Sequence, residues 1–218
     1  RVATDTVDQK VYITTSSEKF ALLHNILVSD DVDSVMVFAN RRDICRTLQE
    51  KLNKRGFKAG LLSGDVPQTR RMKTLESFKS GAVKIMVATD VAGRGIHVDG
   101  VSHVINYTLP EEPEDYVHRI GRTGRAGKTG SSISFACEDD ALLREPIEKL
   151  LDMKLACTMP EENLLQEIVA KPKPKASPKP ASAPVKPKPE NMDSGEQKVA
   201  EKTSSQDKSV DEPAAEED

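Results

Sequence analysis

Two arginines, Arg122 and Arg125, stand three residues apart in the glycine-rich segment YVHRIGRTGRAGKTGS (116–131). Thr123 and Gly124 separate them, so a tight loop or a helix end can bring both guanidinium groups onto one anion. Paired arginines that neutralise charge on a transferring phosphoryl group are arginine fingers, and they act on a nucleotide bound by another domain. A glycine-rich basic turn without a ligand is the alternative, and composition alone does not separate the two.

The same segment ends in Gly127-Lys128-Thr129, which looks like the close of a phosphate-binding P-loop. The pattern G-x-x-x-x-G-K-[ST] needs a glycine five residues before Gly127, and Arg122 occupies that position. A P-loop also joins a strand to a following helix, whereas this segment follows a predicted helix and leads into a predicted strand. We therefore set the P-loop interpretation aside.

Three further loops carry groups that suit a row of phosphates. They read NRR (40–42), SGDVPQTRR (63–71) and TDVAGRGIH (89–97). Helix N-termini, small residues and arginines together bind phosphates, although each signal alone is more often a solvated charge. None of the loops contains an aromatic residue that could stack on a base, so backbone contacts should dominate. We call these three loops the proposed track. Contacts of this kind can still select RNA over DNA through the 2′-hydroxyl groups of RNA.

Short apolar runs that alternate with helical patterns must position these loops. The predicted strands are 10–14, 34–39, 58–62, 84–89, 103–107 and 131–137, and the predicted helices are 18–27, 43–56, 67–81, 112–120 and 139–151. This alternation predicts an α/β fold, a parallel sheet with helices on both faces. Ligands gather at the carboxyl ends of such strands. We therefore expect the site in the loops that follow Ala39, Leu62, Ala88 and Tyr107.

Composition divides the chain into a folded domain, residues 1–160, and a tail, residues 161–218, that we expect to be disordered. Residues 171–189 are rich in lysine and proline, with six lysines and no acidic residue, and residues 190–218 hold three lysines and ten acidic residues. Neither block has the apolar residues needed to offset the entropy of folding. The basic block could hold RNA as an extended polyproline segment, and the acidic block could compete for basic surface. A solvated linker is the favoured interpretation.

The remaining composition excludes several classes of protein. Cys45, Cys137 and Cys157 are scattered, which fits a reducing compartment and predicts neither a disulfide framework nor a metal site. The apolar runs have strand length and are too short to cross a bilayer, so we expect a cytoplasmic protein with no membrane partner. The chain begins at Arg1 without a methionine, and we expect a fragment of a longer protein.

Four motifs carry a family resemblance. In order, FANRRD, SGDVPQTRR, VATDVAGRGIHVDG and YVHRIGRTGR resemble motifs IV, IVa, V and VI of the DEAD-box RNA helicases over about residues 8–155. They match the second of the two RecA-like domains, and two details, Gly-Arg-Gly-Ile-His and Leu-Pro-Glu-Glu-Pro-Glu-Asp-Tyr, are most similar to bacterial RhlB-type helicases. The resemblance implies a RecA-like helicase C-terminal domain that takes part in ATP-dependent RNA unwinding or ribonucleoprotein remodelling.

The resemblance also implies roles for single residues on the ATP side. Arg122 and Arg125 match the arginines that reach the γ-phosphate of ATP, and His118 matches the histidine that couples the nucleotide site to the RNA site. The family usually has an aspartate that contacts the ATP ribose where this chain has His97, which puts ribose recognition at that position in doubt. ATP and Mg²⁺ are expected to be bound mainly by the N-terminal RecA-like domain of the same protein.

On the RNA side, the resemblance implies a second group of residues. Asp90 and Arg94 match positions that link RNA binding to closure of the two domains. The positions expected to hold the RNA backbone are Asn40, Gly64, Gln68, Arg71, Thr89 and Gly95. RNA turnover, with docking to an RNA-degrading endonuclease complex, follows from the RhlB-type details.

Three motifs of the family are absent from the 218 residues: a Walker A loop, the D-E-A-D sequence and the adenine-sensing glutamine motif. Since these belong to the first domain, we expect the isolated chain to have no meaningful ATPase or unwinding activity. Two alternatives stay open. One is an RNA-binding or protein-docking scaffold. The other is a DNA helicase of the same superfamily, and the sequences of motifs V and VI argue against it.

Overall fold

The computed structural model describes residues 6–29, 32–124 and 127–168. Arg125 and the two charged blocks at 171–189 and 190–218 lie outside these ranges, so the predictions made for them are not addressed by the fold. The described residues belong to one compact unit of the chain.

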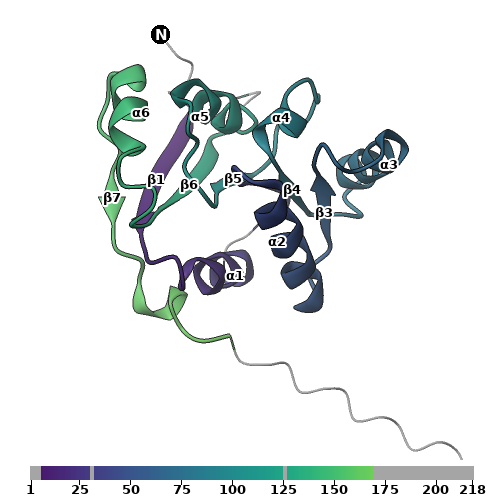
Figure 1. Cartoon of the computed structure of the whole chain (residues 1–218), viewed down its shortest axis with the longest axis horizontal. Coiled ribbons are helices and arrows are strands. Elements are labelled where there is room, and N and C mark those ends of the chain that lie inside the picture. The colour runs from purple at the N-terminus through teal and green to yellow at the C-terminus, as the bar shows by residue number, and fades with distance from the viewer. Residues whose placement is uncertain (1–5, 30–31, 125–126, 169–218) are drawn as a thin grey trace, which may run out of the picture. The chain divides into compact units, whose positions relative to one another are not determined.

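Seven parallel strands form a single sheet in the order β3-β4-β2-β5-β6-β1-β7 (Figure 1). The strands are β1 (Val7–Ile13), β2 (Val35–Phe38), β3 (Ala59–Leu62), β4 (Ile85–Ala88), β5 (His103–Asn106), β6 (Gly130–Ala136) and β7 (Cys157–Thr158). The first six confirm the strands predicted from the apolar runs. β7 was not predicted, because two residues paired only with Val11 and Tyr12 leave no periodic signal.

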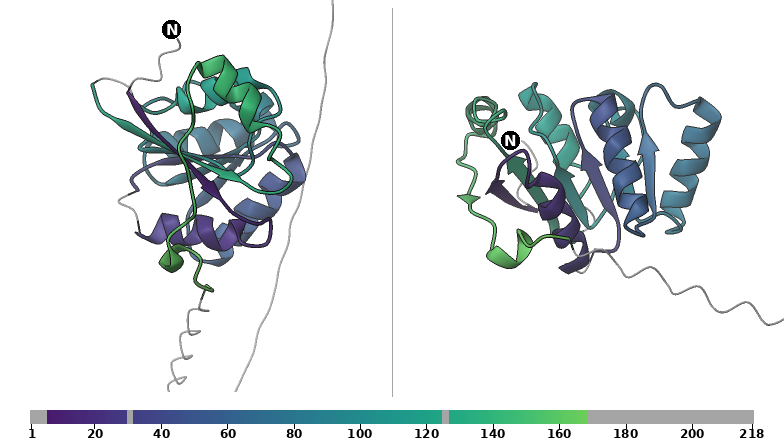
Figure 2. Two further views of the ribbon diagram at one scale, coloured as in Figure 1. Left: turned by 90° about the vertical axis from the view of Figure 1, so that its left-hand side faces the viewer. Right: turned by 60° about the horizontal axis from the view of Figure 1, so that its bottom comes forward.

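Helices cover both faces of the sheet, as predicted. They are α1 (Lys19–Ser29), α2 (Arg42–Lys54), α3 (Gln68–Lys79), α4 (Asp90–Gly93), α5 (Pro113–Ile120) and α6 (Arg144–Leu151), and a 3₁₀-helix, η1 (Glu162–Leu164), follows β7. Along β2, Val35 and Val37 pack against α1 and α2, while Met36 and Phe38 pack in the cluster that contains α3 and α4. The left view of Figure 2 shows α1 and α6 on opposite sides of the sheet. Burial on both faces explains why the strands read as continuous apolar runs.

Besides β7 and the short helix α4, which were not predicted, two segments differ from the sequence prediction. The helix predicted for 139–151 begins at Arg144, because the Asp140 carboxylate reaches back to accept a 2.8 Å hydrogen bond from the Lys19 ammonium, and residues 138–143 form turns. The segment assigned to the tail begins with η1, whose Leu164 is buried in the core and whose Leu164 carbonyl accepts a hydrogen bond from Asn25. Order within the described residues therefore continues past residue 160.

The described residues contain no helix that is long and apolar enough to cross a membrane.

Candidate functional site

The carboxyl ends of β2, β3 and β4 enclose an open cavity of about 790 Å³. The sheet order places these three strands side by side, so the loops that follow them meet at one edge, as the sequence predicts. The cavity is lined by Asn40, Arg41, Arg42, Asp43, Arg46, Gly64, Asp65, Thr89 and Val91. It therefore brings together three of the six predicted RNA-binding residues, and none of the described residues that line it is aromatic.

Charge in this cavity is predominantly basic, with two carboxylates that have basic partners. Arg41 pairs with Asp43 at 2.8 Å, and both side chains are exposed. Asp65 is held by the Ser63 hydroxyl and by Arg46, and these hydrogen bonds lower the pKa of its carboxyl group. Among the described residues, Arg42 has no ion-pair partner. A polyanion entering the cavity meets neutralised acids and at least one free guanidinium group.

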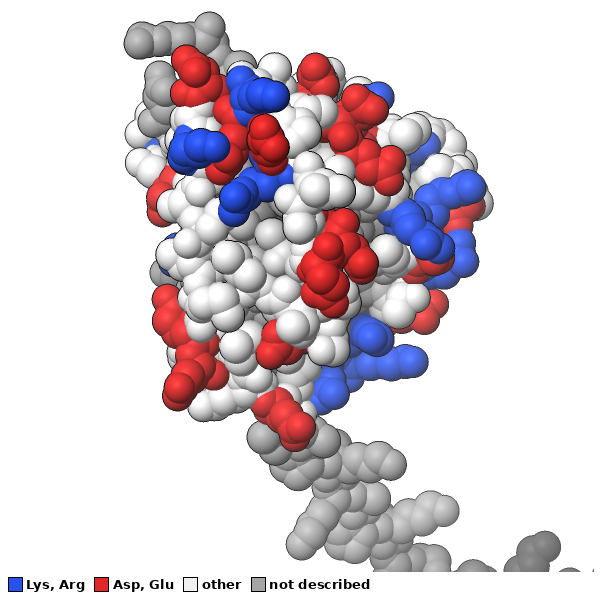
Figure 3. All heavy atoms as spheres, turned by 60° about the vertical axis from the view of Figure 1, so that its left-hand side comes forward, with Lys and Arg blue, Asp and Glu red and all other residues white. Residues whose placement is uncertain are grey.

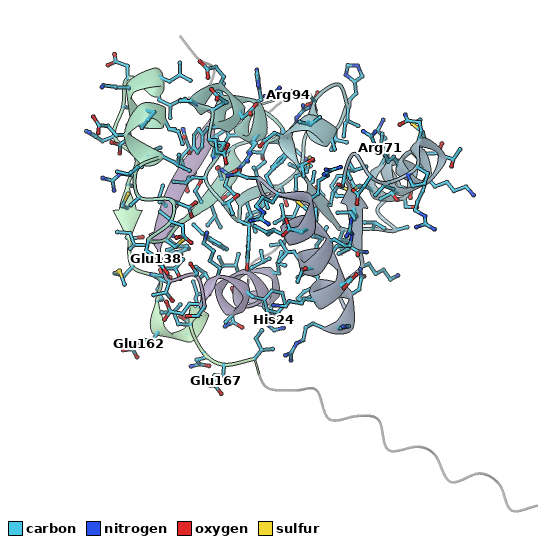
Figure 4. The ribbon with its side chains drawn as sticks, viewed as in Figure 1. His24, Arg71, Arg94, Glu138, Glu162 and Glu167 are labelled. Carbon is cyan, nitrogen blue, oxygen red and sulfur yellow. The ribbon has the colours of Figure 1, made fainter. Side chains whose placement is uncertain are left out.

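Gln68 and Arg71 lie on the first turns of α3, outside the lining of the cavity. Arg71 donates a hydrogen bond to the Gln68 side-chain oxygen at 3.2 Å; Gln68 is exposed and Arg71 is half-buried. The backbone of Gly95 has a φ of +76°, a conformation that favours glycine. Figure 4 shows Arg71 at α3 and Arg94 near α5.

Two predicted RNA-binding side chains already have partners within the protein. The Thr89 hydroxyl accepts a hydrogen bond from the Ala92 nitrogen at 3.4 Å and so caps the short helix α4. The Asn40 amide donates to the Leu109 carbonyl at 2.8 Å, and its oxygen accepts from Arg119 at 2.8 Å. The Asn40 side chain therefore fixes loops, and its backbone N–H also donates a hydrogen bond within the protein, to the Thr108 hydroxyl at 2.9 Å.

Arg119 is the central residue of the site, and the sequence prediction missed it. Its side chain is 1% exposed. It donates to both oxygens of Asp90, at 2.5 and 2.7 Å, and to the Thr108 carbonyl at 2.8 Å, while its guanidinium group lies 5.4 Å from the Phe38 ring centre. With the bond to Asn40, this one side chain joins the ends of β2, β4 and β5 to α5.

Arg94, predicted to link RNA binding to domain closure, and His118, predicted to couple the nucleotide site to the RNA site, meet at one carboxylate. Arg94 donates a hydrogen bond to an oxygen of Asp115, and His118 Nδ1 lies 3.6 Å from the same oxygen. This hydrogen bond raises the pKa of Arg94. Asp90, which was predicted to share the role of Arg94, pairs with Arg119.

Arg122, the first predicted arginine finger, lies against the loop that follows α4. It donates to the Ile96 carbonyl at 2.8 Å and to the Gly93 carbonyl at 3.1 Å, and Asp99 lies 3.7 Å away. These carbonyl oxygens are acceptors that phosphate oxygens could replace. His97 is exposed on the same loop.

Close backbone packing explains the glycines around Arg122. Gly124 has a φ of +69°, and a Cβ there would lie 2.8 Å from the Thr6 carbonyl. A Cβ on Gly130 would overlap the Gly124 nitrogen and the Thr123 hydroxyl. The segment follows α5 and leads into β6, which is the reverse of the strand-to-helix order of a P-loop.

Comparison with known proteins identifies the family to which this chain is similar. The sequence model of the helicase conserved C-terminal domain matches residues 18–127, about half of the chain. The ATP-dependent RNA helicase RhlB of Pseudomonas aeruginosa is 57% identical over 170 residues, covering 78% of this chain and 43% of that protein. RhlB of Pseudomonas putida is 56% identical with the same coverage. The chain thus spans less than half the length of the curated relatives that it matches.

Solved structures agree with this assignment. The DEAD-box protein SrmB of E. coli, bound to regulator of ribonuclease activity A, superposes with a TM-score of 0.67 at 30% identity, covering 77% of this chain and 98% of that one. A DEAD box protein of Methanococcus jannaschii also gives a TM-score of 0.67, at 36% identity, covering 71% of this chain and 42% of that one. The chain therefore belongs to the helicase conserved C-terminal domain family, with the RecA-like fold of DEAD-box proteins and high similarity to the RhlB helicases.

Proposed function

We propose that this chain is the second RecA-like domain of an ATP-dependent RNA helicase. It holds the backbone of single-stranded RNA at the carboxyl edge of its sheet, and it presents Arg122 and Arg125 to ATP bound mainly by a preceding RecA-like domain. The observation that carries the proposal is the position of Arg119. This buried guanidinium group joins the cavity loops at Asn40 and Asp90 to the helix that leads to Arg122.

The cavity supports RNA as its ligand through the chemistry of its lining. Arg41 and Arg46 line it in pairs with Asp43 and Asp65, and the Arg42 guanidinium group is left to meet a phosphate. Gly64 leaves room, because a Cβ there would meet nothing within 4 Å. Contacts of this kind bind a nucleic-acid backbone with little dependence on base sequence. Thr89 lines the cavity, Gln68, Arg71 and Gly95 extend the proposed track beyond it, and contacts to 2′-hydroxyl groups would separate RNA from DNA.

For ATP, the residues present fit one part of a nucleotide site. Arg122 can exchange two carbonyl acceptors for phosphate oxygens, and in doing so it would neutralise charge that develops on the transferring phosphoryl group. Among the described residues, no group of three His, Cys, Asp or Glu side chains is arranged to hold a metal ion. Mg²⁺, which would neutralise charge on the phosphates, would be held mainly by the preceding domain.

Coupling between the two ligands follows from shared structure. The loop after β4 carries Thr89 and Gly95 on the RNA side, and its carbonyl oxygens at Gly93 and Ile96 hold Arg122. When RNA orders this loop, it also positions Arg122 for the nucleotide. The two domains then close on one RNA strand and bend it, which separates it locally from its complementary strand. ATP hydrolysis reopens the domains.

A protein partner is supported by a separate face of the molecule. Figure 3 shows the side that carries α6 and β7, where a broad uncharged area is bordered by acidic and basic side chains. Leu142 and Met159 are 88% and 67% exposed. We propose that an RNA-degrading endonuclease complex docks to the protein, which would place it in RNA turnover in the cytoplasm.

Titration of the chain with fluorescently labelled single-stranded RNA tests the RNA part. We expect binding that weakens as salt concentration rises, with single-stranded DNA competing less well. ATP hydrolysis by the chain alone should be negligible and should appear when a RecA-like domain with a Walker A loop is added. Absence of RNA binding, or substantial RNA-stimulated hydrolysis by the chain alone, would contradict the proposal.

A further inference from the structure

The Asp115 carboxylate is buried beneath two exposed side chains. The exposed fractions of the side chains are 9% for Asp115, 55% for Arg94 and 61% for His118. Arg94 and the His118 imidazole both approach the same oxygen, Oδ1. One buried carboxylate oxygen thus lies against two surface groups, in a hydrogen bond with Arg94 and 3.6 Å from the His118 ring nitrogen.

The three residues come from two separate segments of the fold. Asp115 and His118 are three residues apart on α5, so they lie on one face of that helix. Arg94 caps the C-terminal end of α4. The carboxylate therefore connects the loop that follows β4 to α5 at a second point, besides the contact between Asp90 and Arg119.

Two other charged side chains of α5 make no contact of this kind. Glu114 is exposed and, among the described residues, has no ion-pair partner. Arg119 directs its guanidinium group to Asp90, Asn40, Asn106 and Thr108. Of these side chains, Asp115 is the one that reaches both Arg94 and His118.

We propose that Asp115 is a positioning residue, which holds Arg94 and His118 side by side on the surface that meets the preceding domain. The inference rests on the proposed function. A long exposed arginine loses much rotamer freedom when it is fixed in a contact, and a side chain that is already oriented loses less on closure of the domains. Since pairs with an exposed partner add little to folding stability, the effect of Asp115 should appear in domain coupling.

The test uses the complete two-domain protein that contains this chain. Asp115→Asn keeps the shape of the side chain and removes its charge. We expect the RNA concentration that gives half-maximal ATPase stimulation to rise about tenfold, within the usual range of coupling between two sites, while the RNA affinity of the chain alone stays within about twofold. Glu114→Gln removes a charge from the adjacent, exposed position and should leave both values unchanged. Equal behaviour of the two variants would overturn the proposal.

A double-mutant cycle gives a second test that does not alter the buried residue. Arg94→Gln and His118→Gln change exposed side chains, so both variants should fold. If Asp115 makes the two groups act together, the double variant should lose little more coupling than either single variant, whereas additive losses contradict the inference.

Failure of this inference can be told apart from failure of the proposed function. If Arg122→Ala abolishes turnover while Asp115→Asn behaves as Glu114→Gln does, the positioning role alone is wrong. If Arg122→Ala leaves turnover intact, the proposed function is wrong, and the inference falls with it.

Discussion

Arg119 and Asp90 form a two-point ion pair, with Nε 2.5 Å from one carboxylate oxygen and Nη2 2.7 Å from the other. The arginine side chain is 1% exposed and the aspartate side chain 16% exposed. A pair buried to this extent depends on both members, because removal of one leaves an uncompensated charge. The loops that carry the proposed RNA and nucleotide groups are thus joined through a contact that tolerates little change.

Replacement of Arg119 should destabilise the fold. Arg119→Met keeps much of the volume but leaves Asp90 without its partner, and we expect the free energy of unfolding to fall by about 3–5 kcal/mol. Urea denaturation followed by circular dichroism measures this. Arg41→Met breaks an exposed pair with Asp43 and should change stability far less, because solvent screens an exposed pair. Similar losses in the two variants would show that burial does not set the strength of the Arg119 contact.

Replacement of Arg122 should separate hydrolysis from RNA binding. In the complete two-domain protein, Arg122→Ala should lower ATP turnover roughly 10³-fold or more, the low end of the range for arginine fingers, with RNA affinity largely kept. Steady-state hydrolysis and fluorescence anisotropy give the two values. Lys128→Ala is the control, since a lysine outside a P-loop should not affect turnover. An equal collapse of RNA affinity would refute the finger assignment.

Arg71 should contribute one phosphate contact to RNA binding. Arg71→Ala should weaken binding of different RNA sequences by a similar factor and reduce the slope of log affinity against log salt by roughly one contact. The matched control is Lys54→Ala. Lys54 ends α2 and lies about 18 Å along the helix axis from Arg42, which lines the cavity. An unchanged slope in Arg71→Ala would remove that residue from the track.

The two glycines Gly130 and Gly64 should respond differently to alanine. Gly130→Ala overlaps the backbone at Gly124, and we expect a loss of about 1–3 kcal/mol in the free energy of unfolding. Gly64→Ala has free space around it and should fold normally. If Gly64→Ala nevertheless weakens RNA binding, the backbone of a bound strand passes close to that loop. Chemical denaturation and RNA titration of both variants provide the comparison.

Stability should fall in alkaline solution. Burial raises the pKa of Cys45, Tyr107 and Tyr116 to about 12, whereas in the unfolded chain a thiol titrates near about 8.5 and a phenol near about 10. The unfolded state then releases protons first, so the stability from these neutral groups is complete below about pH 8.5 and declines as the pH rises towards about 12. Urea midpoints measured between about pH 8 and pH 11 should show this. Cys45→Ala should reduce the loss of stability at the lower end of this pH range. An unchanged dependence of stability on pH would contradict the raised pKa of Cys45.

Much of the fold and of the site could be predicted from local sequence. The apolar runs determined six of the strands, and the loops NRR, SGDVPQTRR and TDVAGRGIH were expected at the carboxyl edge, where the structure places them around one cavity. Periodicity and motif spacing are properties of short stretches of chain, so the elements and the motif-bearing loops can be inferred without knowledge of their neighbours.

Only the tertiary structure decided which side chains meet. Arg119 contacts Asp90 across 29 residues and Asn40 across 79, and the partners of Arg94 and His118 likewise depend on how α4 and α5 pack. Such pairs follow from the order of the strands in the sheet, and no local pattern encodes that order. The sequence by itself therefore determined the elements and the chemical groups that they carry. The fold decided that Arg119 and Asp115 hold those groups in place, because burial and pairing of charge arise only when distant segments come together.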